Sequence, residues 1–471
     1  LADRVTKHTL ENGMRIIFVE QDAAPVIAFN LMFDVGGVDE PLGLGGVAHM
    51  AEHMAFKGTE TIGSFDLAAE MDALAEVEVE ALSLEWLREN GTDEEIAEAE
   101  ARFGEARARA QELASASPLD DLLSGNGGVG LNASTAYDRT AYVVELPANR
   151  LELYARIYAD VLANPVFRYF YEERDVVREE RRQRSEDDPQ GVLFEAFLGE
   201  AFQTHLYGRP LIGPAEEIEG YRATEARAIF DLFYHPNRAV LALVGDVNPE
   251  RDLPILERYF GALPEGPDFR PGIRSEPEQT EERRVTIDYD AEPQIAIGYH
   301  KPTYPERDAY VLDLADALLS NGRTSRLYRR MVTGDQLALD TFTSSSFPGS
   351  RYDNVFLFYG LPRSPNTPED LEAAFYDEIE RLKTEGVSEE ELQKVKNQVR
   401  AQTVRGLASN SGLAANVAYN ELFAGGWERL TEDLEIYDSI TADEIQVAVQ
   451  TYFVPENRTV ATLVTATEGS Q

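Results

Sequence analysis

The chain contains no cysteine among its 471 residues, which excludes disulfide bonds, thiolate metal sites and cysteine nucleophiles. It also has no apolar run of about eighteen residues, the length that a membrane-spanning helix requires. Basic residues are scarce, because 43 Lys and Arg are outnumbered by 85 Asp and Glu, which gives a formal net charge of −42. Such a charge repels nucleic acids and anionic membrane surfaces, so we expect neither as a partner.

The length and composition indicate a folded protein with more than one domain. A chain of 471 residues exceeds what a single hydrophobic core usually organises, and 43% of the residues are apolar. Segments 234–244 and 453–464 resemble each other, because each reads as a helix end, a turn marked by proline and a buried strand. A weaker echo relates Pro25 and the apolar residues after it to Pro293 and its neighbours. We therefore predict an internal duplication.

The two repeats set the expected domain boundaries. We place the first domain at residues 1–262 and the second, which lacks a metal-binding motif, at residues 285–471. Residues 263–284 are rich in proline and charge, as is typical of a linker. Residues 76–117 are rich in Ala, Glu, Leu and Arg and are broken once at Asn90-Gly91-Thr92, which predicts a helical hairpin inserted into the first repeat.

Apolar and alternating runs between helical segments predict the α+β fold class. We expect strands at residues 14–20, 26–35, 140–146, 239–245, 284–289 and 295–300. Strands that follow one another closely can pair as hairpins, while the helices come in blocks. The prediction is two homologous domains, each a mostly antiparallel sheet packed against helices, with the helical insertion in the first.

Histidine is also scarce, yet two of the six histidines lie four residues apart in His49-Met50-Ala51-Glu52-His53. On a helix this spacing places both imidazoles on one face, where they can bind one metal ion with Glu52 near its water. The alternative is two surface histidines beside a solvated glutamate. Without cysteine ligands, the H-x-x-E-H pattern predicts the core of a zinc hydrolase, with Zn²⁺ as the cofactor.

A catalytic zinc ion needs a third protein ligand in addition to two histidines. Glu173 and Glu180 are seven residues apart in a predicted helix and therefore share one face two turns apart. One of the two carboxylates can bind the metal while the other supports a ligand. The alternative is a solvated, charged helix without a metal role.

Several segments together resemble the pitrilysin/insulinase family of zinc metallopeptidases. They are the H-x-x-E-H helix, the glycine-rich lead at 36–40, the Glu173 to Glu180 segment, the strand at 130–134 and the stretch 205–208. The resemblance covers almost the entire chain, including the duplication. The family includes the mitochondrial processing peptidase, and this chain is similar to its zinc-bearing subunit and to bacterial two-domain members.

The resemblance implies roles for individual residues. His49, His53 and Glu180 would bind zinc, Glu52 would be the catalytic base, and Glu173 would be a supporting carboxylate near the metal. Zinc would polarise the scissile carbonyl and lower the pKa of its water, while Glu52 accepts a proton and later delivers it to the leaving amine. The competing ligand Glu179 would point about 100° away from Glu180 around the helix.

The resemblance also implies a substrate-binding strand. Asn132, Ala133 and Ser134 begin an alternating segment that in the family pairs through its backbone with an extended peptide. Such pairing draws affinity from main-chain hydrogen bonds and tolerates many peptide sequences. The alternative is an ordinary internal strand with Asn132 in a turn.

The second half departs from the family pattern. Active members usually carry an arginine and a tyrosine, seven residues apart, that bind substrate, and here Val332 and Leu339 stand at those positions. Neither side chain can donate a hydrogen bond to an oxyanion. We therefore expect a heterodimer in which a homologous partner subunit supplies the Arg/Tyr pair, although Arg329 or Arg330 could substitute through a shifted register.

The expected function is a zinc-dependent endopeptidase that cleaves peptides or small unfolded proteins. The alternatives are a self-sufficient homodimeric peptidase and a non-catalytic subunit for peptide binding or assembly. A metal-dependent hydrolase of another substrate is disfavoured only by the family resemblance. Because the chain begins at Leu1 without a methionine and the family has bacterial members, we expect a periplasmic or otherwise exported location, with the cytoplasm as the alternative.

Overall fold

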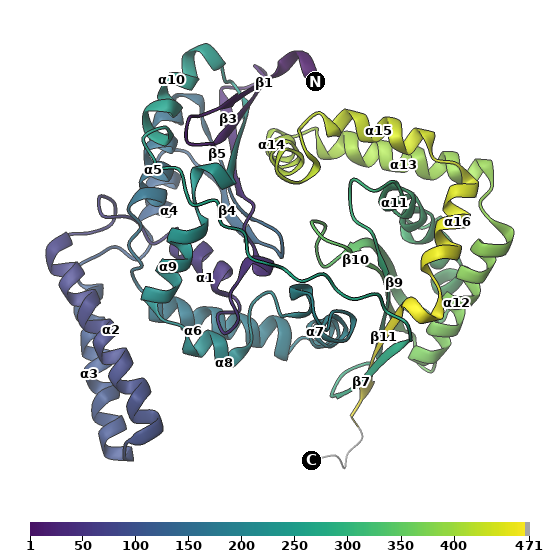
Figure 1. The fold of residues 1–471 in the computed structure, drawn as a ribbon, viewed down its shortest axis with the longest axis horizontal. Coiled ribbons are helices and arrows are strands. Elements are labelled where there is room, and N and C mark those ends of the chain that lie inside the picture. The colour runs from purple at the N-terminus through teal and green to yellow at the C-terminus, as the bar shows by residue number, and fades with distance from the viewer. Residues whose placement is uncertain (467–471) are drawn as a thin grey trace. The chain divides into compact units, whose positions relative to one another are not determined.

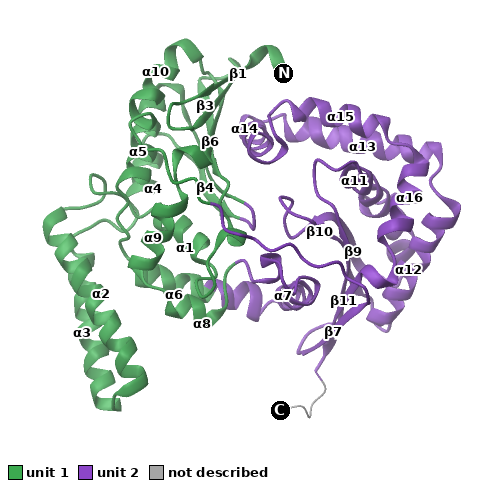
Figure 2. Cartoon of the chain, viewed as in Figure 1, with its two compact units in different colours: residues 1–135, 139–179, 212–269 green, residues 136–138, 180–211, 270–471 purple. Residues whose placement is uncertain are grey.

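Two mixed sheets, described by a computed structural model for residues 1–466, organise the chain (Figure 1). Unit 1 comprises residues 1–135, 139–179 and 212–269, and unit 2 comprises residues 136–138, 180–211 and the chain from 270 onward (Figure 2). Each unit contains one sheet and one hydrophobic core. Within residues 1–466, no helix combines the length and the hydrophobicity needed to span a bilayer.

The sheet of unit 1 has the strand order β1-β2-β6-β3-β5-β4. Its strands are β1 (Val5–Thr9), β2 (Arg15–Glu20), β3 (Val26–Phe33), β4 (Val129–Thr135), β5 (Thr140–Pro147) and β6 (Ala239–Gly245). The β2–β6 pair is parallel and the other pairs are antiparallel. Every residue of β6 is buried, as expected for an apolar run in the middle of a sheet.

The sheet of unit 2 has the order β7-β11-β8-β10-β9. Its strands are β7 (Arg283–Tyr289), β8 (Gln294–Lys301), β9 (Ala338–Phe347), β10 (Asn354–Pro362) and β11 (Arg458–Thr465). The β7–β11 pair is parallel and the other pairs are antiparallel. Without β1, the first sheet has the same order and the same strand directions, which confirms the predicted duplication and the α+β fold class.

Each unit also contains helices, some of which pack directly against its sheet. In unit 1 they are α1 (Val47–Met54), α2 (Leu67–Asn90), α3 (Asp93–Gln111), α4 (Pro118–Gly125), α5 (Leu151–Ala163), α6 (Phe170–Arg181, which ends in unit 2), α8 (Ala215–Gly220), α9 (Ala223–Phe233) and α10 (Pro249–Phe260). In unit 2 they are α7 (Pro189–Ala201), α11 (Arg307–Ser320), α12 (Pro368–Glu385), α13 (Glu389–Gly406), α14 (Asn410–Tyr419), α15 (Arg429–Ser439) and α16 (Ala442–Tyr452). Unit 2 also contains the π-helical turns η4 (Arg182–Glu186), η7 (Tyr328–Gly334) and η8 (Asn420–Ala424).

Helices α2 and α3 form the helical hairpin expected from the sequence. The second helix is preceded by Thr92, whose hydroxyl accepts a hydrogen bond from the Glu95 amide while the Glu95 carboxylate accepts one from the Thr92 amide. The facing side of α3 is made of buried alanines at 99, 106 and 110, which let the two helices approach closely. Helix α2 starts at Leu67, earlier than the predicted start at residue 76, and its first residues pack on the body of unit 1.

Candidate metal centre

The backbone at the start of helix α1 donates hydrogen bonds to two carboxylates, those of Glu40 and Glu217. Glu40 accepts hydrogen bonds from the amides of Gly46 and Ala48, both at 2.8 Å. A negative charge at this end of a helix is stabilised by the helix dipole. Gly46 has φ +83°, and a Cβ atom there would lie 2.0 Å from the carbonyl oxygen of Ile212. The glycine-rich lead therefore fixes the direction in which α1 leaves the loop.

Helix α1 has one face in the core and one face directed to a cluster of metal-binding groups. The core face consists of Val47, Met50, Ala51 and Met54, all buried. On the other face His49 and His53 each offer a ring nitrogen, and with one carboxylate oxygen of Glu180 these atoms lie within 4.8 Å of one another. Two imidazoles and one carboxylate are a common protein ligand set for catalytic zinc. The structure thus brings the three predicted ligands together.

Helix α6 carries both predicted carboxylates, with Val177 between them fully buried. Burial of Val177 fixes the rotation of the helix and therefore the side on which Glu173 and Glu180 lie. Glu180 also accepts an ion pair from Arg184 at 2.6 Å. The competing ligand Glu179 is exposed and does not belong to the metal-binding group of the described residues.

Glu173 supports the histidine pair. Its carboxylate bonds Nδ1 of His53 at 3.0 Å and Nζ of Lys57 at 2.5 Å. Burial raises the pKa of Glu173, but the hydrogen bonds from His53 and Lys57 lower it by more, so its pKa lies below the ordinary value. Lys57 was not predicted as a site residue from the sequence, although its position four residues after His53 could have indicated the contact.

Glu52 is buried beside the histidines, with 8% of its surface exposed. Its Oε2 accepts a hydrogen bond of 2.6 Å from the hydroxyl of Thr135 on β4, a residue that was not predicted from the sequence. An open pocket of about 300 Å³ contains Glu52. It is lined by Glu52, His53, Phe56, Lys57, Ala116, Ser117, Asp120, Leu131, Asn132, Ala133 and Glu173. A carboxylate in such a pocket can exchange a proton with a bound molecule.

Strand β4 forms one wall of this pocket and one edge of the sheet. It pairs with β5 on one side, and it is the last strand of the order within the described residues. Asn132 and Ala133 line the pocket, whereas the hydroxyl of Ser134 accepts a hydrogen bond from Arg139. The register is regular from Asn132 to Thr135 and irregular before it. An edge strand of this kind can accept a further strand.

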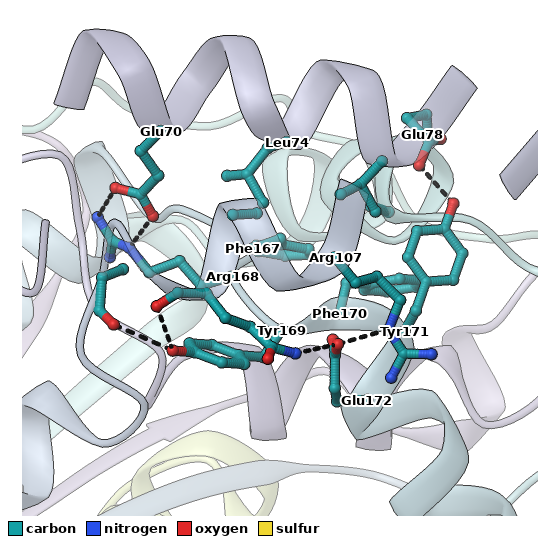
Figure 3. A pocket seen from close by; sticks show the side chains of 15 residues that line it. Glu70, Leu74, Glu78, Arg107, Phe167, Arg168, Tyr169, Phe170, Tyr171 and Glu172 are labelled. Carbon is teal, nitrogen blue, oxygen red and sulfur yellow. Dashed lines mark hydrogen bonds and ion pairs between the residues drawn. The ribbon is translucent and has the colours of Figure 1, made fainter. Parts of the chain in front are cut away.

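A buried arginine connects the loop after α1 with the hairpin and with the start of α6 (Figure 3). Arg168 is 1% exposed and pairs with Glu70 of α2 through two guanidinium nitrogens. It also donates to the carbonyl oxygens of Lys57, Thr59 and Ile62 at 2.7–3.0 Å. Next to it, Gly58 has φ +95°, and a Cβ atom there would lie 2.7 Å from the guanidinium. These contacts hold Lys57 in place beside Glu173.

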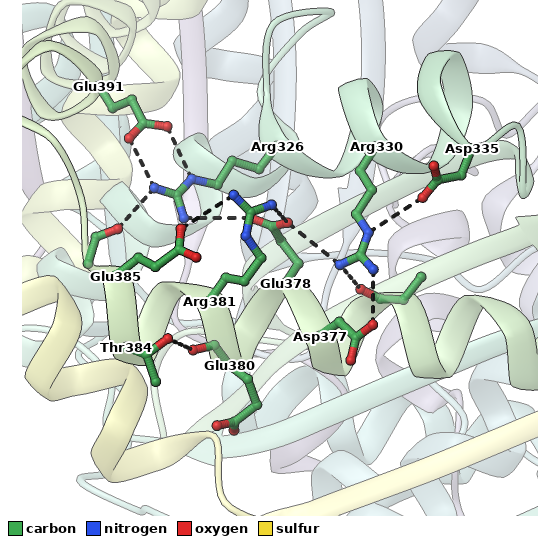
Figure 4. Close-up of polar contacts among 12 residues, drawn as sticks. Arg326, Arg330, Asp335, Asp377, Glu378, Glu380, Arg381, Thr384, Glu385 and Glu391 are labelled. Carbon is green, nitrogen blue, oxygen red and sulfur yellow. Dashed lines mark hydrogen bonds and ion pairs between the residues drawn. The ribbon is translucent and has the colours of Figure 1, made fainter.

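In unit 2, Val332 lies in η7 and Leu339 at the start of β9, with 52% of Leu339 exposed. Arg330 is held by the carboxylate of Asp377 and the carbonyl oxygen of Ala374, both at 3.0 Å (Figure 4). Both acceptors belong to helix α12, so the Arg330 guanidinium is hydrogen-bonded to that helix. Arg329 is exposed, so of the two predicted substitutes it is the one whose side chain is open to solvent.

Two family models match the chain. The model described as insulinase (peptidase family M16) matches residues 15–78 and 114–215, and the model described as peptidase M16 inactive domain matches residues 222–399. The interruption between residues 78 and 114 contains most of the α2–α3 hairpin. The first model therefore covers the residues of the metal-binding cluster, and the second covers the segment with Val332 and Leu339.

Individual proteins are also similar to this chain. The zinc protease PqqE of Helicobacter pylori is 25% identical over 460 residues, which cover 96% of this chain and 91% of that protein. The crystal structure of a protease from Helicobacter pylori matches with a TM-score of 0.82 and 24% identity over 98% of this chain and 99% of that chain. The periplasmic protease PqqL of Escherichia coli matches with a TM-score of 0.72 and 18% identity over 98% of this chain and 48% of that chain.

Proposed function

This chain belongs to the insulinase family of peptidases (family M16), and on that premise we propose that it is a zinc-dependent endopeptidase of peptides or small unfolded proteins. The observation that carries the proposal is the cluster of His49, His53 and Glu180 with Glu52 on the same helix. Relatives of similar length are named zinc proteases. A subunit used only for assembly has no chemical need for a buried carboxylate beside three metal ligands.

The donor set fits zinc, because it consists of two nitrogen atoms and one oxygen atom and leaves a coordination position for substrate or water. Bound zinc would supply a Lewis acid that polarises the scissile carbonyl and lowers the pKa of water. The Nδ1 atom of His53 is engaged by Glu173, so His53 would bind the metal through Nε2. Glu173 thereby selects the tautomer and the ring orientation of this ligand.

The remaining residues of the pocket would act on the substrate. Glu52 would accept a proton from the attacking water and deliver it to the leaving amine, and Thr135 would hold the carboxylate in position. Asn132, Ala133 and Ser134 would pair with an extended peptide along the β4 edge. Thr135 belongs to the strand that would pair with the peptide, and its hydroxyl is hydrogen-bonded to Glu52. The proposed base therefore lies beside the proposed peptide-binding edge.

We further propose that this chain is the zinc-bearing subunit of a heterodimer. Val332 and Leu339 cannot donate hydrogen bonds, and Arg330 is engaged by α12. A homologous partner would then supply the arginine and the tyrosine. A self-sufficient homodimer is the second candidate, because Arg329 is exposed. A non-catalytic subunit is the third, and the match of residues 222–399 to an inactive-domain model favours it over other non-enzymatic functions.

The compartment that we propose is the periplasm. Its support is the fold similarity to a periplasmic protease of Escherichia coli. The cytoplasm is the alternative, and fractionation of the native host with an antibody against the chain would decide between them.

The decisive experiment measures hydrolysis of quenched fluorescent peptides by the purified chain, together with its zinc content, and uses Glu52→Gln as the control. Bound zinc with peptide cleavage that disappears in the variant would establish a self-sufficient peptidase and contradict the need for a partner. Bound zinc without cleavage, followed by activity on addition of a homologous chain that carries the Arg/Tyr pair, is the result expected for the heterodimer. A chain that binds no zinc would overturn the proposed function.

A further inference from the structure

The outer face of helix α2 exposes an unusual number of large apolar side chains. Five of the twelve large hydrophobic residues that are exposed among the described residues lie between positions 65 and 86. Phe65 (73% exposed) precedes the helix, and the other four lie on α2. These four, Met71 (47%), Val79 (62%), Leu82 (38%) and Trp86 (62%), we call the α2 face. A concentration of exposed apolar side chains on one surface is typical of an interaction site.

The α2 face is not required to hold the hairpin together. Val77 and Leu84 are buried on the opposite side of α2, where they meet α3 and the body of unit 1. At 100° per residue, Met71, Val79, Leu82 and Trp86 fall within an arc of about 80°. The rise of the helix makes this stripe about 22 Å long. A straight apolar stripe of this length fits the apolar side of another helix of about fifteen residues.

The charge around the α2 face is strongly negative. Residues 67–111 contain 13 Asp and Glu and 4 Lys and Arg. All four basic residues are already paired, because Arg88, Arg102 and Arg109 bind carboxylates within the hairpin and Arg107 binds Glu172 of α6. Asp72 and Glu89 are exposed near the two ends of the stripe. The apolar stripe is therefore surrounded by a net negative charge, which comes from carboxylates.

We propose that the α2 face is a docking surface for a basic amphipathic helix of a partner protein. Leu- or Ile-type side chains of that helix would cover the apolar stripe, and its Lys and Arg residues would meet the carboxylates at the rim. A second copy of this hairpin is a poor occupant, since it would bring two strongly acidic surfaces together. An anionic membrane surface is repelled for the same reason. The proposal does not depend on the peptidase function.

Trp86 makes the docking directly measurable, because the chain contains only two tryptophans. The other, Trp427, is 8% exposed and can be replaced by phenylalanine. In a Glu52→Gln and Trp427→Phe background, which prevents cleavage, the protein is titrated with a synthetic helical peptide of about eighteen Leu and Lys residues. We expect a blue shift of the Trp86 emission and an apparent affinity that falls as salt is raised. A matched peptide of Leu and Glu should give no shift.

The double variant Val79→Ser and Leu82→Ser removes apolar surface while Trp86 stays as the reporter. We expect this double variant to bind the Leu/Lys peptide at least about tenfold more weakly, because two apolar side chains that the peptide would cover are lost. Its circular dichroism and melting temperature should remain those of the parent, because both side chains are exposed. If Trp427→Phe perturbs folding, the difference between parent and Trp86→Phe spectra gives the same signal.

Three results would overturn the proposal. The first is a missing shift with the Leu/Lys peptide, and the second is an equal shift with the Leu/Glu peptide. The third is a blue shift that depends on protein concentration without any peptide, which would assign the α2 face to a second copy of the chain. None of these outcomes bears on zinc binding or peptide cleavage, so they cannot be confused with failure of the proposed function.

Discussion

Helices α1 and α11 follow equivalent strands of two sheets that share a five-strand order, yet they present different chemistry. Each follows the strand, β3 or β8, that lies between the parallel pair and the edge hairpin. Helix α1 carries His49 and His53 of the metal-binding cluster, and His53 also lines the open pocket. Helix α11 instead places Asp313 and Asp316 against hydroxyl groups of unit 2. The same duplicated arrangement of strands and helices can therefore carry metal-binding side chains in one unit and hydrogen-bonded carboxyl groups in the other.

The environments of the carboxylates explain the difference. Asp313 accepts hydrogen bonds from the hydroxyls of Tyr304 and Tyr437, and Asp316 accepts one from Thr343. Burial raises the pKa of Asp316 to about 7, and the Thr343 hydrogen bond only partly offsets this effect. The carboxyl groups of Asp313 and Asp316 thus accept hydrogen bonds from neutral hydroxyl groups within unit 2. Glu52, by contrast, lines an open pocket.

The largest expected effect is loss of the metal from α1. We expect His49→Ala and His53→Ala each to weaken zinc binding more than a hundredfold and to abolish peptide cleavage, because two protein ligands rarely retain zinc. Metal analysis after dialysis against a chelator measures the first effect. The matched variant Asp316→Asn on α11 should keep its zinc. Full zinc occupancy in both histidine variants would place the site elsewhere.

The next effect concerns the residue that orients His53. Glu173→Gln should lower zinc affinity about ten- to a hundredfold, since loss of such supporting carboxylates has this typical effect. The neighbouring Glu172 binds Arg107 and Gln111 instead, so Glu172→Gln is a control with the same chemistry on the same helix. Chelator competition gives both affinities. Equal affinities in the two variants would show that the His53 contact is not functional.

A third variant tests what unit 2 lacks. If the missing arginine and tyrosine limit activity, Val332→Arg combined with Leu339→Tyr should raise peptide cleavage by the isolated chain at least about tenfold. The two single variants are the controls, and each should give less than the pair. An isolated chain that is already fully active, with no gain from the double variant, would contradict the heterodimer.

The smallest effect is on stability, and it concerns only unit 2. Because the pKa of Asp316 is about 7 in the folded protein and near 3.9 in an unfolded chain, the native state binds more protons between these values. The free energy of unfolding therefore falls as the pH rises from about 4 to about 7, by up to about 4 kcal/mol. Asp316→Asn should remove this dependence, so the variant should be the more stable protein above pH 7.

Denaturant unfolding at pH 4 and pH 8 measures this effect. The exposed Asp443 of α16 provides the control, and Asp443→Asn should leave the pH dependence unchanged. Parallel pH profiles for the parent and Asp316→Asn would show that the Asp316 carboxyl titrates normally.

The sequence predicted those features whose chemistry is local or repeated. The H-x-x-E-H pattern needs only one turn of helix, and the duplication could be recognised from segments 234–244 and 453–464, which contain Asn237 and Asn457. In the structure each of these asparagines donates a side-chain hydrogen bond to a backbone carbonyl of its own unit, Gly266 or His300. The α+β fold class and the predicted strands are confirmed, but the sequence did not predict β1, β9 and β10.

Other features depend on contacts that sequence spacing does not show. Thr135 is 83 residues from Glu52, and Arg168 is 111 residues from Lys57. Such partners become neighbours only after the sheet and the helices have packed. The early start of α2 was missed for another reason, since this helix has apolar residues on two sides and therefore lacks the one-sided pattern that marks a helix boundary.

Under the proposed function, the short regular edge of β4 limits which molecules can bind beside Glu52. Only four residues, Asn132–Thr135, keep regular pairing with β5, a length of about 13 Å in an extended chain. A polypeptide can join this edge only if the same length of its own backbone is unbonded. A native protein keeps its amides and carbonyls inside its own helices and sheets. The strand would thus select unfolded polypeptides over folded proteins through backbone hydrogen bonds alone, whatever their side chains.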